Sequence, residues 1–239
     1  MHADGVAAVD RAFNILAAFD SREAPLRLAE LSRRTGLYKS TILRIAASLE
    51  RAGFVCRFAD GRFAVGPGSL RLAQIYQESF NLRDSLQPIL QRLSKDSGET
   101  ASFYVRQGSV RVCLHRVEPA RSIRHSVCEG DRLPLDRGAA GTVLRAFSDE
   151  PSRSLSEVRS QLWVASFGER DPEIASVAAA VFAPNNEMKG ALSLSGPRER
   201  FTPEGVAKAA RLLLVAASTL TGAFGGDTSV YRVKRRSVG

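Results

Sequence analysis

The sequence predicts an α+β protein with two domains, and three observations support this. The first 65 residues have the pattern of three helices followed by a β-hairpin. A Gly-Pro-Gly segment at residues 66–68 separates them from the rest of the chain. Beyond residue 98 strand patterns alternate with helical ones, which indicates a mixed sheet flanked by helices. A chain of 239 residues is long enough for two such domains.

The N-terminal domain begins with three predicted helices. We expect Asp10 to cap the first, whose apolar positions keep a three-to-four spacing up to Phe19. The second spans Leu28–Thr35 and ends at Gly36, because glycine adopts a left-handed backbone at the least cost. The third runs from about Lys39 to Arg51, with its apolar side chains on one face.

A β-hairpin completes this domain, which we assign to residues 1–66. The apolar runs Phe54–Phe58 and Arg62–Val65 flank Asp60-Gly61. An Asp-Gly pair between alternating runs is a strong indication of a tight hairpin turn.

A linker helix (67–81) and a second domain (82–226) follow, and residues 227–239 form a basic tail. The last helix of the second domain opens at Thr202-Pro203, a capping residue before a proline. The other expected helices are Ser69–Phe80, Leu82–Ser97 and Gly138–Phe147. The expected strands are Thr100–Arg106, Val110–Val117, Ser122–Cys128, Ile174–Phe182 and Gly190–Ser195.

The net charge of +9, from 34 basic and 25 acidic residues, favours an anionic partner such as nucleic acid. It does not locate the binding site. Residues 1–80 carry a net charge of +3, and the last nine residues alone carry +4. The basic tail is either a nucleic-acid contact arm or, more commonly for such a segment, an unstructured end.

Cysteine content and hydropathy predict a cytoplasmic protein that has no membrane partner. Three cysteines are too few, and odd in number, for a disulfide scaffold. The N-terminus lacks the apolar stretch of a signal peptide. The uncharged segment Leu212–Gly226 is 15 residues long, which is short of the roughly 20 that span a bilayer, so we expect a buried helix there.

The third helix has the features of a DNA-recognition helix. Ser40 and Arg44 lie one turn apart on its polar face, and Lys39 stands at its N-terminal end. Such a helix presents N-terminal residues to base edges, and its free amides favour phosphate. The hairpin adds Arg57 and Arg62, which suit phosphate or minor-groove contacts. The alternative is that these basic side chains only form a solvated surface.

With these residues the sequence resembles the IclR-type bacterial transcription regulators. Leu26–Val55 is similar to their winged helix-turn-helix, and Gly130–Gly141 and Gly190–Gly196 are similar to segments of their effector domain. The resemblance covers nearly the whole chain. It implies a winged helix-turn-helix, a linker helix and a GAF-like effector-binding domain, in homodimers or homotetramers on double-stranded palindromic operators. Tyr38 departs from the family, which commonly has proline there.

We expect seven residues to contact operator DNA, on the basis of this resemblance and of the helix and hairpin patterns. They are Arg27, Lys39, Ser40, Thr41, Arg44, Arg57 and Arg62.

The second domain is expected to bind a small organic acid of a catabolic pathway. The run Gly138–Gly141 opens a helix, where small residues let a ligand approach and free amides favour a carboxylate. Taken alone, the run indicates tight helix–strand packing, and only the resemblance favours a pocket. Ser193 and Ser195, two apart on a strand, share a face. The expected effector-binding residues are Leu133, Gly138, Ala139, Ala140, Ser166, Glu169, Ala180, Ser193 and Ser195.

No metal, cofactor or catalytic site is expected. Cys113 and His115 are two apart on a strand and would share a face, but His125 and Cys128, three apart, would not. The chain has three histidines and no nucleophile elbow, phosphate loop or paired carboxylates. We therefore expect a regulator and not an enzyme. Whether it represses or activates, the operator sequence and the acid remain open at this point.

Overall fold

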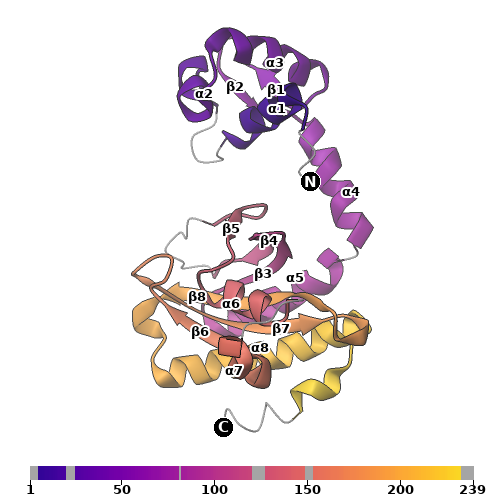
Figure 1. The fold of residues 1–239 in the computed structure, drawn as a ribbon, viewed down its shortest axis with the longest axis vertical. Coiled ribbons are helices and arrows are strands. Elements are labelled where there is room, and N and C mark those ends of the chain that lie inside the picture. Colours follow the sequence, from indigo (N-terminus) through magenta and orange to yellow (C-terminus); the bar gives the residue numbers. More distant parts are fainter. Residues whose placement is uncertain (1–4, 20–24, 81, 120–126, 149–152, 233–239) are drawn as a thin grey trace. The chain divides into compact units, whose positions relative to one another are not determined.

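The computed structural model describes residues 5–19, 25–80, 82–119, 127–148 and 153–232. The chain divides into two compact units, residues 1–80 (unit 1) and 81–239 (unit 2). Figure 1 shows unit 1 as helices around a short hairpin, and unit 2 as a sheet with helices against it. The predicted α+β class is confirmed.

Unit 1 contains four helices and one hairpin among its described residues. Its core is formed by the side chains of Ile15, Leu26, Leu31, Ile42, Ala46, Val55 and Phe63. The elements are α1 (Ala7–Ala17), α2 (Leu28–Thr35), α3 (Lys39–Arg51), β1 (Val55–Arg57), β2 (Phe63–Val65) and α4 (Gly68–Phe80).

The start and orientation of α1 differ from the sequence expectation. Val6, not Asp10, is the N-cap residue, and Asp10 lies in the first turn. Ile15 is the buried residue of the helix, whereas Val9 and Phe13 are exposed. The apolar spacing therefore marks two faces of α1, one in the core of unit 1 and one on its surface.

The turn between α2 and α3 is closed by hydrogen bonds as well as by glycine. Gly36 has φ +68°, so the left-handed end of α2 is confirmed. Its amide donates to the Ser32 carbonyl at 3.0 Å. The Ser32 hydroxyl donates to the Leu37 carbonyl at 2.7 Å. The predicted hairpin is also confirmed, with Gly61 at φ +81° in its turn.

Unit 2 is built on a six-stranded sheet in the order β5-β4-β3-β8-β7-β6. The strands are β3 (Thr100–Gln107), β4 (Val110–Val117), β5 (Arg132–Pro134), β6 (Trp163–Phe167), β7 (Ile174–Phe182) and β8 (Met188–Pro197). The α-helices are α5 (Leu82–Ser97), α6 (Ala139–Ala146), α7 (Ser156–Gln161) and α8 (Pro203–Ala223). Single 3-10 turns cover Arg153–Leu155, Pro184–Asn186, Arg198–Arg200 and Thr228–Tyr231.

The sheet is antiparallel at every described strand pairing, so the expectation of a mixed sheet is wrong. Strands β3 to β5 pair in sequence order, as do β6 to β8, and β8 joins these two halves of the sheet by pairing with β3. The elements β5, α7 and β6 are not predicted by the sequence patterns. Of the expected strand 122–128, residues 122–126 lie outside the described residues, and Val127 and Cys128 are not in a strand.

Helices cover both faces of this sheet. α5 and α8 pack against each other and against the central strands, while α6 and α7 lie on the other face (Figure 1). α8 is long and apolar enough by composition to cross a membrane. Most of its Leu and Ala side chains are instead buried in the core of unit 2. Thr202 caps it as expected, since its hydroxyl accepts from the Gly205 amide.

The turn Thr228–Tyr231 belongs to the core of unit 2 and not to a free tail. The Tyr231 side chain is fully buried. Its hydroxyl donates to the Ala180 carbonyl at 2.8 Å and lies 2.9 Å from the Thr221 hydroxyl. Burial raises the pKa of this phenol. One aromatic side chain thus fixes the end of the described chain to β7 and α8.

We expect Tyr231→Phe to lower the free energy of unfolding of unit 2 by about 1–3 kcal/mol, because it leaves a buried carbonyl and hydroxyl without their partner. Chemical denaturation followed by circular dichroism measures the change. Tyr38→Phe is the control, since Tyr38 is 84% exposed and should change stability by less than about 0.5 kcal/mol. Equal effects of the two variants would contradict the assigned role of Tyr231.

Candidate functional site

Unit 1 presents the expected DNA-contacting side chains on α3, the hairpin and the start of α2. Lys39, Ser40 and Thr41 form the first turn of α3, and Arg44 lies one turn further. Lys39, Ser40 and Arg44 are exposed, which leaves the polar face of α3 accessible. Arg27 is exposed at the N-cap position of α2. The buried residues of α3 are Ile42 and Ala46, on its opposite side.

The two arginines of the hairpin differ in their surroundings. The Arg62 Nε lies 2.6 Å from the Asp60 carboxylate. Hydrogen bonds to this carboxylate, first from the Arg62 amide and then from the Arg62 side chain, hold the pKa of Asp60 below its usual value. The Arg57 guanidinium lies over the Phe63 ring, 5.3 Å from its centroid, and the residue is exposed. Arg57 therefore offers its positive charge to solvent, whereas the charge of Arg62 is partly offset within the turn.

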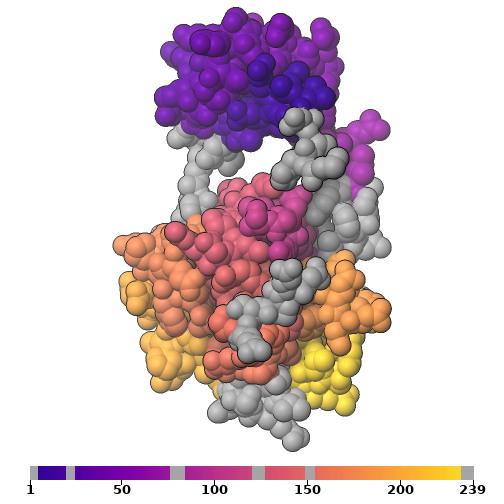
Figure 2. Space-filling model, viewed as in Figure 1, coloured from indigo at the N-terminus to yellow at the C-terminus, as the bar shows by residue number. Residues whose placement is uncertain are grey.

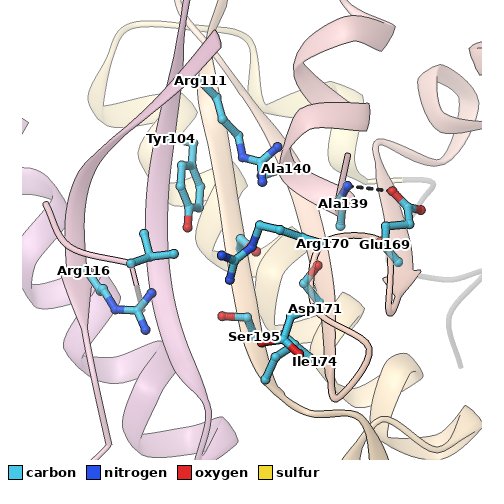
Figure 3. A pocket seen from close by; sticks show the side chains of 15 residues that line it. Tyr104, Arg111, Arg116, Ala139, Ala140, Glu169, Arg170, Asp171, Ile174 and Ser195 are labelled. Carbon is cyan, nitrogen blue, oxygen red and sulfur yellow. Dashed lines mark hydrogen bonds between the residues drawn. The ribbon is translucent and has the colours of Figure 1, made fainter. Parts of the chain in front are cut away.

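A pocket in unit 2 brings together seven of the nine expected effector-binding residues (Figure 3). They are Gly138, Ala139, Ala140, Ser166, Glu169, Ser193 and Ser195. The pocket also has lining residues that the sequence patterns did not indicate, namely Tyr104, Arg111, Arg116, Val127, Arg170, Asp171, Ile174 and Ser176. Its cavity volume is about 50 Å³.

The other two expected residues, Leu133 and Ala180, do not line the pocket. Leu133 pairs with Arg111 in the sheet and packs at the edge of the hydrophobic core. Ala180 lies on β7, four residues beyond Ser176, and is fully buried in that core. Their side chains are apolar and were expected to line the apolar wall, but in the structure they stabilise the sheet beside the pocket.

The floor of the pocket is a row of hydroxyl side chains across three strands. Ser195 on β8 lies directly opposite Ser176 on β7, and Ser176 lies opposite Ser166 on β6. Directly opposed residues point to the same face of a sheet. The row therefore gives this face a hydrogen-bonding surface. Ser193 and Ser195 both line the pocket, which agrees with the expectation that they share a face.

A β-bulge places two arginines of β4 on this same face. Phe103 pairs with His115 and Tyr104 pairs with Cys113, so Leu114 is an extra residue without a partner on β3. A bulge of this kind reverses the alternation of side chains beyond it. Arg111 and Arg116 are five apart in sequence and would face opposite ways on a regular strand, but with the bulge both face the pocket.

The same bulge separates Cys113 from His115, so the expectation that they share a face is wrong. They pair with adjacent residues of β3, which point to opposite faces. Burial raises the pKa of the Cys113 thiol to about 12. Among the described residues no three His, Cys, Asp or Glu side chains form a group that could hold a metal ion. His125 lies outside the described residues.

Arg111 is anchored by the backbone next to α6. It is buried, and its Nη1 donates to the carbonyls of Pro134 and Arg137. Its guanidinium lies 5.5 Å from the centroid of the Tyr104 ring. Burial lowers the pKa of Arg111, and burial raises the pKa of Tyr104 to about 12. The Nε of Arg111 is buried without a hydrogen-bond partner in the protein.

Arg116 is anchored at the other end of β4. Its Nε lies 3.1 Å from the Glu118 carboxylate, and its side chain is 6% exposed. Its Nη2 is buried without a hydrogen-bond partner in the protein. In Figure 3 the side chain of Arg170, from the loop after β6, extends between Tyr104 and Ser195.

A carboxylate of the protein itself occupies part of the N-terminal end of α6. The Glu169 Oε2 accepts from the Gly138 amide at 2.6 Å, shown dashed in Figure 3. An anion at this position is favoured by the helix dipole. The sequence predicts that the amides at the start of α6 are free to bind a ligand carboxylate. At Gly138 this prediction is wrong, because Glu169 already accepts from that amide.

Each of the two units matches a profile of a known protein domain. The profile of the IclR helix-turn-helix domain matches residues 8–57. The profile of the bacterial transcriptional regulator IclR C-terminal domain matches residues 74–154 and 150–221. The chain belongs to the IclR family. This family consists of DNA-binding transcriptional regulators and not of enzymes.

Relatives in the IclR family align along most of the chain. The acetate operon repressor of Salmonella typhimurium is 26% identical over 92% of this chain and 91% of its own length. The transcriptional repressor IclR of Escherichia coli is 24% identical over the same shares. An IclR regulator from Alicyclobacillus acidocaldarius has a similar fold, with a TM-score of 0.76 and 24% identity over 93% of this chain and 100% of that chain.

We expect Gly141→Ala to lower the free energy of unfolding of unit 2 by about 1–3 kcal/mol. A Cβ there would lie 2.4 Å from the Leu135 carbonyl and 2.6 Å from Arg111 Nη1. This overlap outweighs the roughly 0.5–1 kcal/mol that alanine gains over glycine in a helix. Denaturation curves measure the change, with Thr142→Ala in the same helix as control. A more stable Gly141→Ala variant would contradict the close packing at Arg111.

Proposed function

We propose that this protein is a ligand-responsive regulator that binds operator DNA through unit 1 and a small organic acid through unit 2. The two buried arginines of the pocket are the main support for the acid. A buried guanidinium with an unpartnered N–H is costly, and an anion that pairs with it recovers that cost. Both Arg111 and Arg116 have such an N–H. We place the protein in the cytoplasm, where its DNA would be.

On the DNA side, the first two turns of α3 would enter the major groove. Lys39 and the free amides of the first turn suit a phosphate, and Arg44 is long enough to reach a base edge. Arg57 on the hairpin suits a neighbouring phosphate or the minor groove, and Arg27 a backbone phosphate. Arg62 is a weaker candidate, because Asp60 already pairs with it.

We expect Arg44→Gln to weaken operator binding while the protein remains folded. Loss of a base contact costs about 1–3 kcal/mol and relaxes one operator position, whereas loss of a phosphate contact weakens all sequences alike and lowers the salt slope by about one. Fluorescence anisotropy over a range of salt concentrations separates the two outcomes. Arg51→Gln, in the last turn of the same helix, is the control. Unchanged operator binding by Arg44→Gln would refute the proposed orientation of α3.

We further propose that two copies associate through the exposed apolar face of α1 and α4. Figure 2 shows α1, in the darkest indigo, at the surface of unit 1. Phe13 is 66% exposed, and Val9, Leu70, Leu72 and Ile75 are also exposed. Side chains of α1, α3 and α4 line a groove of about 690 Å³ next to them. A second copy would cover this apolar surface, and a twofold dimer matches a palindromic operator.

We expect Phe13→Glu to weaken self-association at least about tenfold, because burial of a phenylalanine contributes about 1.5–3 kcal/mol. Sedimentation equilibrium over a range of protein concentrations measures the dissociation constant. Phe58→Glu, at an exposed aromatic position of the hairpin, should leave self-association unchanged. The interface is misplaced if both variants self-associate as the native chain does.

Binding of the acid should change the affinity for DNA. One relative in fold supports the ligand class: an IclR homologue of Microbacterium hydrocarbonoxydans, 18% identical with a TM-score of 0.77 over 92% of this chain and 99% of that chain, was solved with 4-hydroxybenzoate. We expect at least one of a panel of aliphatic and aromatic carboxylates to raise the melting temperature and to shift operator affinity. If no carboxylate does either, the proposed effector function is wrong.

A further inference from the structure

The pocket has two separate places for an anionic group. One is the Nε of Arg111 and the other is the Nη2 of Arg116, each buried and without a hydrogen-bond partner in the protein. Three guanidinium groups line the pocket, those of Arg111, Arg116 and Arg170, against the two carboxylates of Glu169 and Asp171. Glu118, from outside the lining, offsets the charge of Arg116, so the two unpartnered N–H groups and not a net charge define the two places.

The two carboxylates are already engaged and leave the arginines to a ligand. Glu169 Oε2 accepts from the Gly138 amide at 2.6 Å. Asp171 Oδ1 accepts from the Glu173 amide at 3.1 Å. Neither hydrogen bond involves Arg111 or Arg116, so an anion from outside is what would pair with their buried N–H groups.

The two arginines are held apart. Arg111 lies opposite Arg106, and Arg116 lies opposite Ser102, which is four residues along β3. Four strand steps correspond to about 13 Å between the Cα atoms. The anchors keep the two guanidinium groups from converging, because one is bound by backbone carbonyls beside α6 and the other by Glu118 beyond the end of β4. Two anionic groups on one ligand match this separation better than a single carboxylate.

The space between the arginines suits a narrow and polar ligand. The cavity is about 50 Å³ and opens beside the exposed Glu169 and Arg170. The serine row of its floor offers hydroxyls instead of an apolar surface for a ring. A flexible chain with polar substituents matches these hydroxyls better than an apolar ring does.

We propose that the effector is a short-chain aliphatic dicarboxylate that spans the pocket, with one carboxylate at Arg111 and the other at Arg116. This inference rests on the proposed function of the pocket as an effector site. The serine hydroxyls then bind the polar substituents of the chain, and Arg170 lies at the opening.

The test is isothermal titration calorimetry of the full-length protein with acids matched in chain length. The dicarboxylates are malonate, succinate and glutarate, the monocarboxylates are propionate, butyrate and valerate, and 4-hydroxybenzoate represents aromatic acids. We expect one dicarboxylate to bind at least about tenfold more tightly than its matched monocarboxylate, because a second charged hydrogen bond contributes that much. The aromatic acid is expected to bind more weakly than that dicarboxylate.

Variants of the two arginines test whether each of them binds one carboxylate of the ligand. Arg116→Gln should weaken dicarboxylate binding about ten- to a hundredfold and reduce the preference over the monocarboxylate to less than about threefold. Arg116→Lys keeps the charge and should have an intermediate effect. Arg92→Gln, on α5 with a side chain 85% exposed, is the control for loss of one positive charge. Arg111→Gln is the second test. If it unfolds because the anchors to the Pro134 and Arg137 carbonyls are lost, Arg116→Gln alone decides.

The outcomes separate this inference from the proposed function. If a monocarboxylate or 4-hydroxybenzoate binds as tightly as every dicarboxylate, the dicarboxylate proposal is wrong while the effector function stands. If Arg116→Gln binds the dicarboxylate as the native protein does, the assignment to the two arginines is wrong. If no acid of any of the three classes binds, both proposals are wrong.

Discussion

One extra residue in a strand determines the chemistry of unit 2. Leu114 has no partner on β3, and this bulge brings Arg116 to the face on which Arg111 lies. On a regular strand one of the two guanidinium groups would instead face α5 and α8, where the core is apolar and a charge would be very costly. Both guanidinium groups therefore lie on the face of the sheet that has serine hydroxyls and an opening to solvent.

The arginines and the end of α6 together set the electrostatics of the pocket. Glu169 accepts a hydrogen bond from the Gly138 amide, so the helix end is partly satisfied by the protein itself. Two buried N–H groups of residues that line the pocket, Arg111 Nε and Arg116 Nη2, lack a hydrogen-bond partner in the protein. Small residues at the start of α6 matter for another reason: a Cβ at Gly141 would overlap the Leu135 carbonyl and Arg111. The small residues of the run Gly138–Gly141 therefore allow close packing against Arg111, and the first three residues of the same run also line the pocket.

Local patterns predicted the elements that depend on short-range rules. The helices Leu28–Thr35 and Lys39–Arg51 have the expected bounds, because Gly36 and the apolar spacing act within a few residues. The α8 cap at Thr202 follows for the same reason. The patterns missed β5 and β6, which have three and five residues and are held in place mainly by pairing with the strands beside them. In α1 the apolar side chains form two faces, and only the packing of unit 1 shows that Ile15, and not Phe13, is in the core.

By itself the sequence determined the α+β class, the order of most helices and strands, the IclR family and seven of the residues that line the pocket. These follow from periodicity, caps, turns and recognisable segments, which are local in the chain. Only the tertiary structure decided that the sheet is antiparallel, that Tyr231 is buried beside Thr221, and that Arg111 and Arg116 share a face. Register and side-chain direction depend on which residue of a partner strand lies opposite, and a single unpaired residue reverses them.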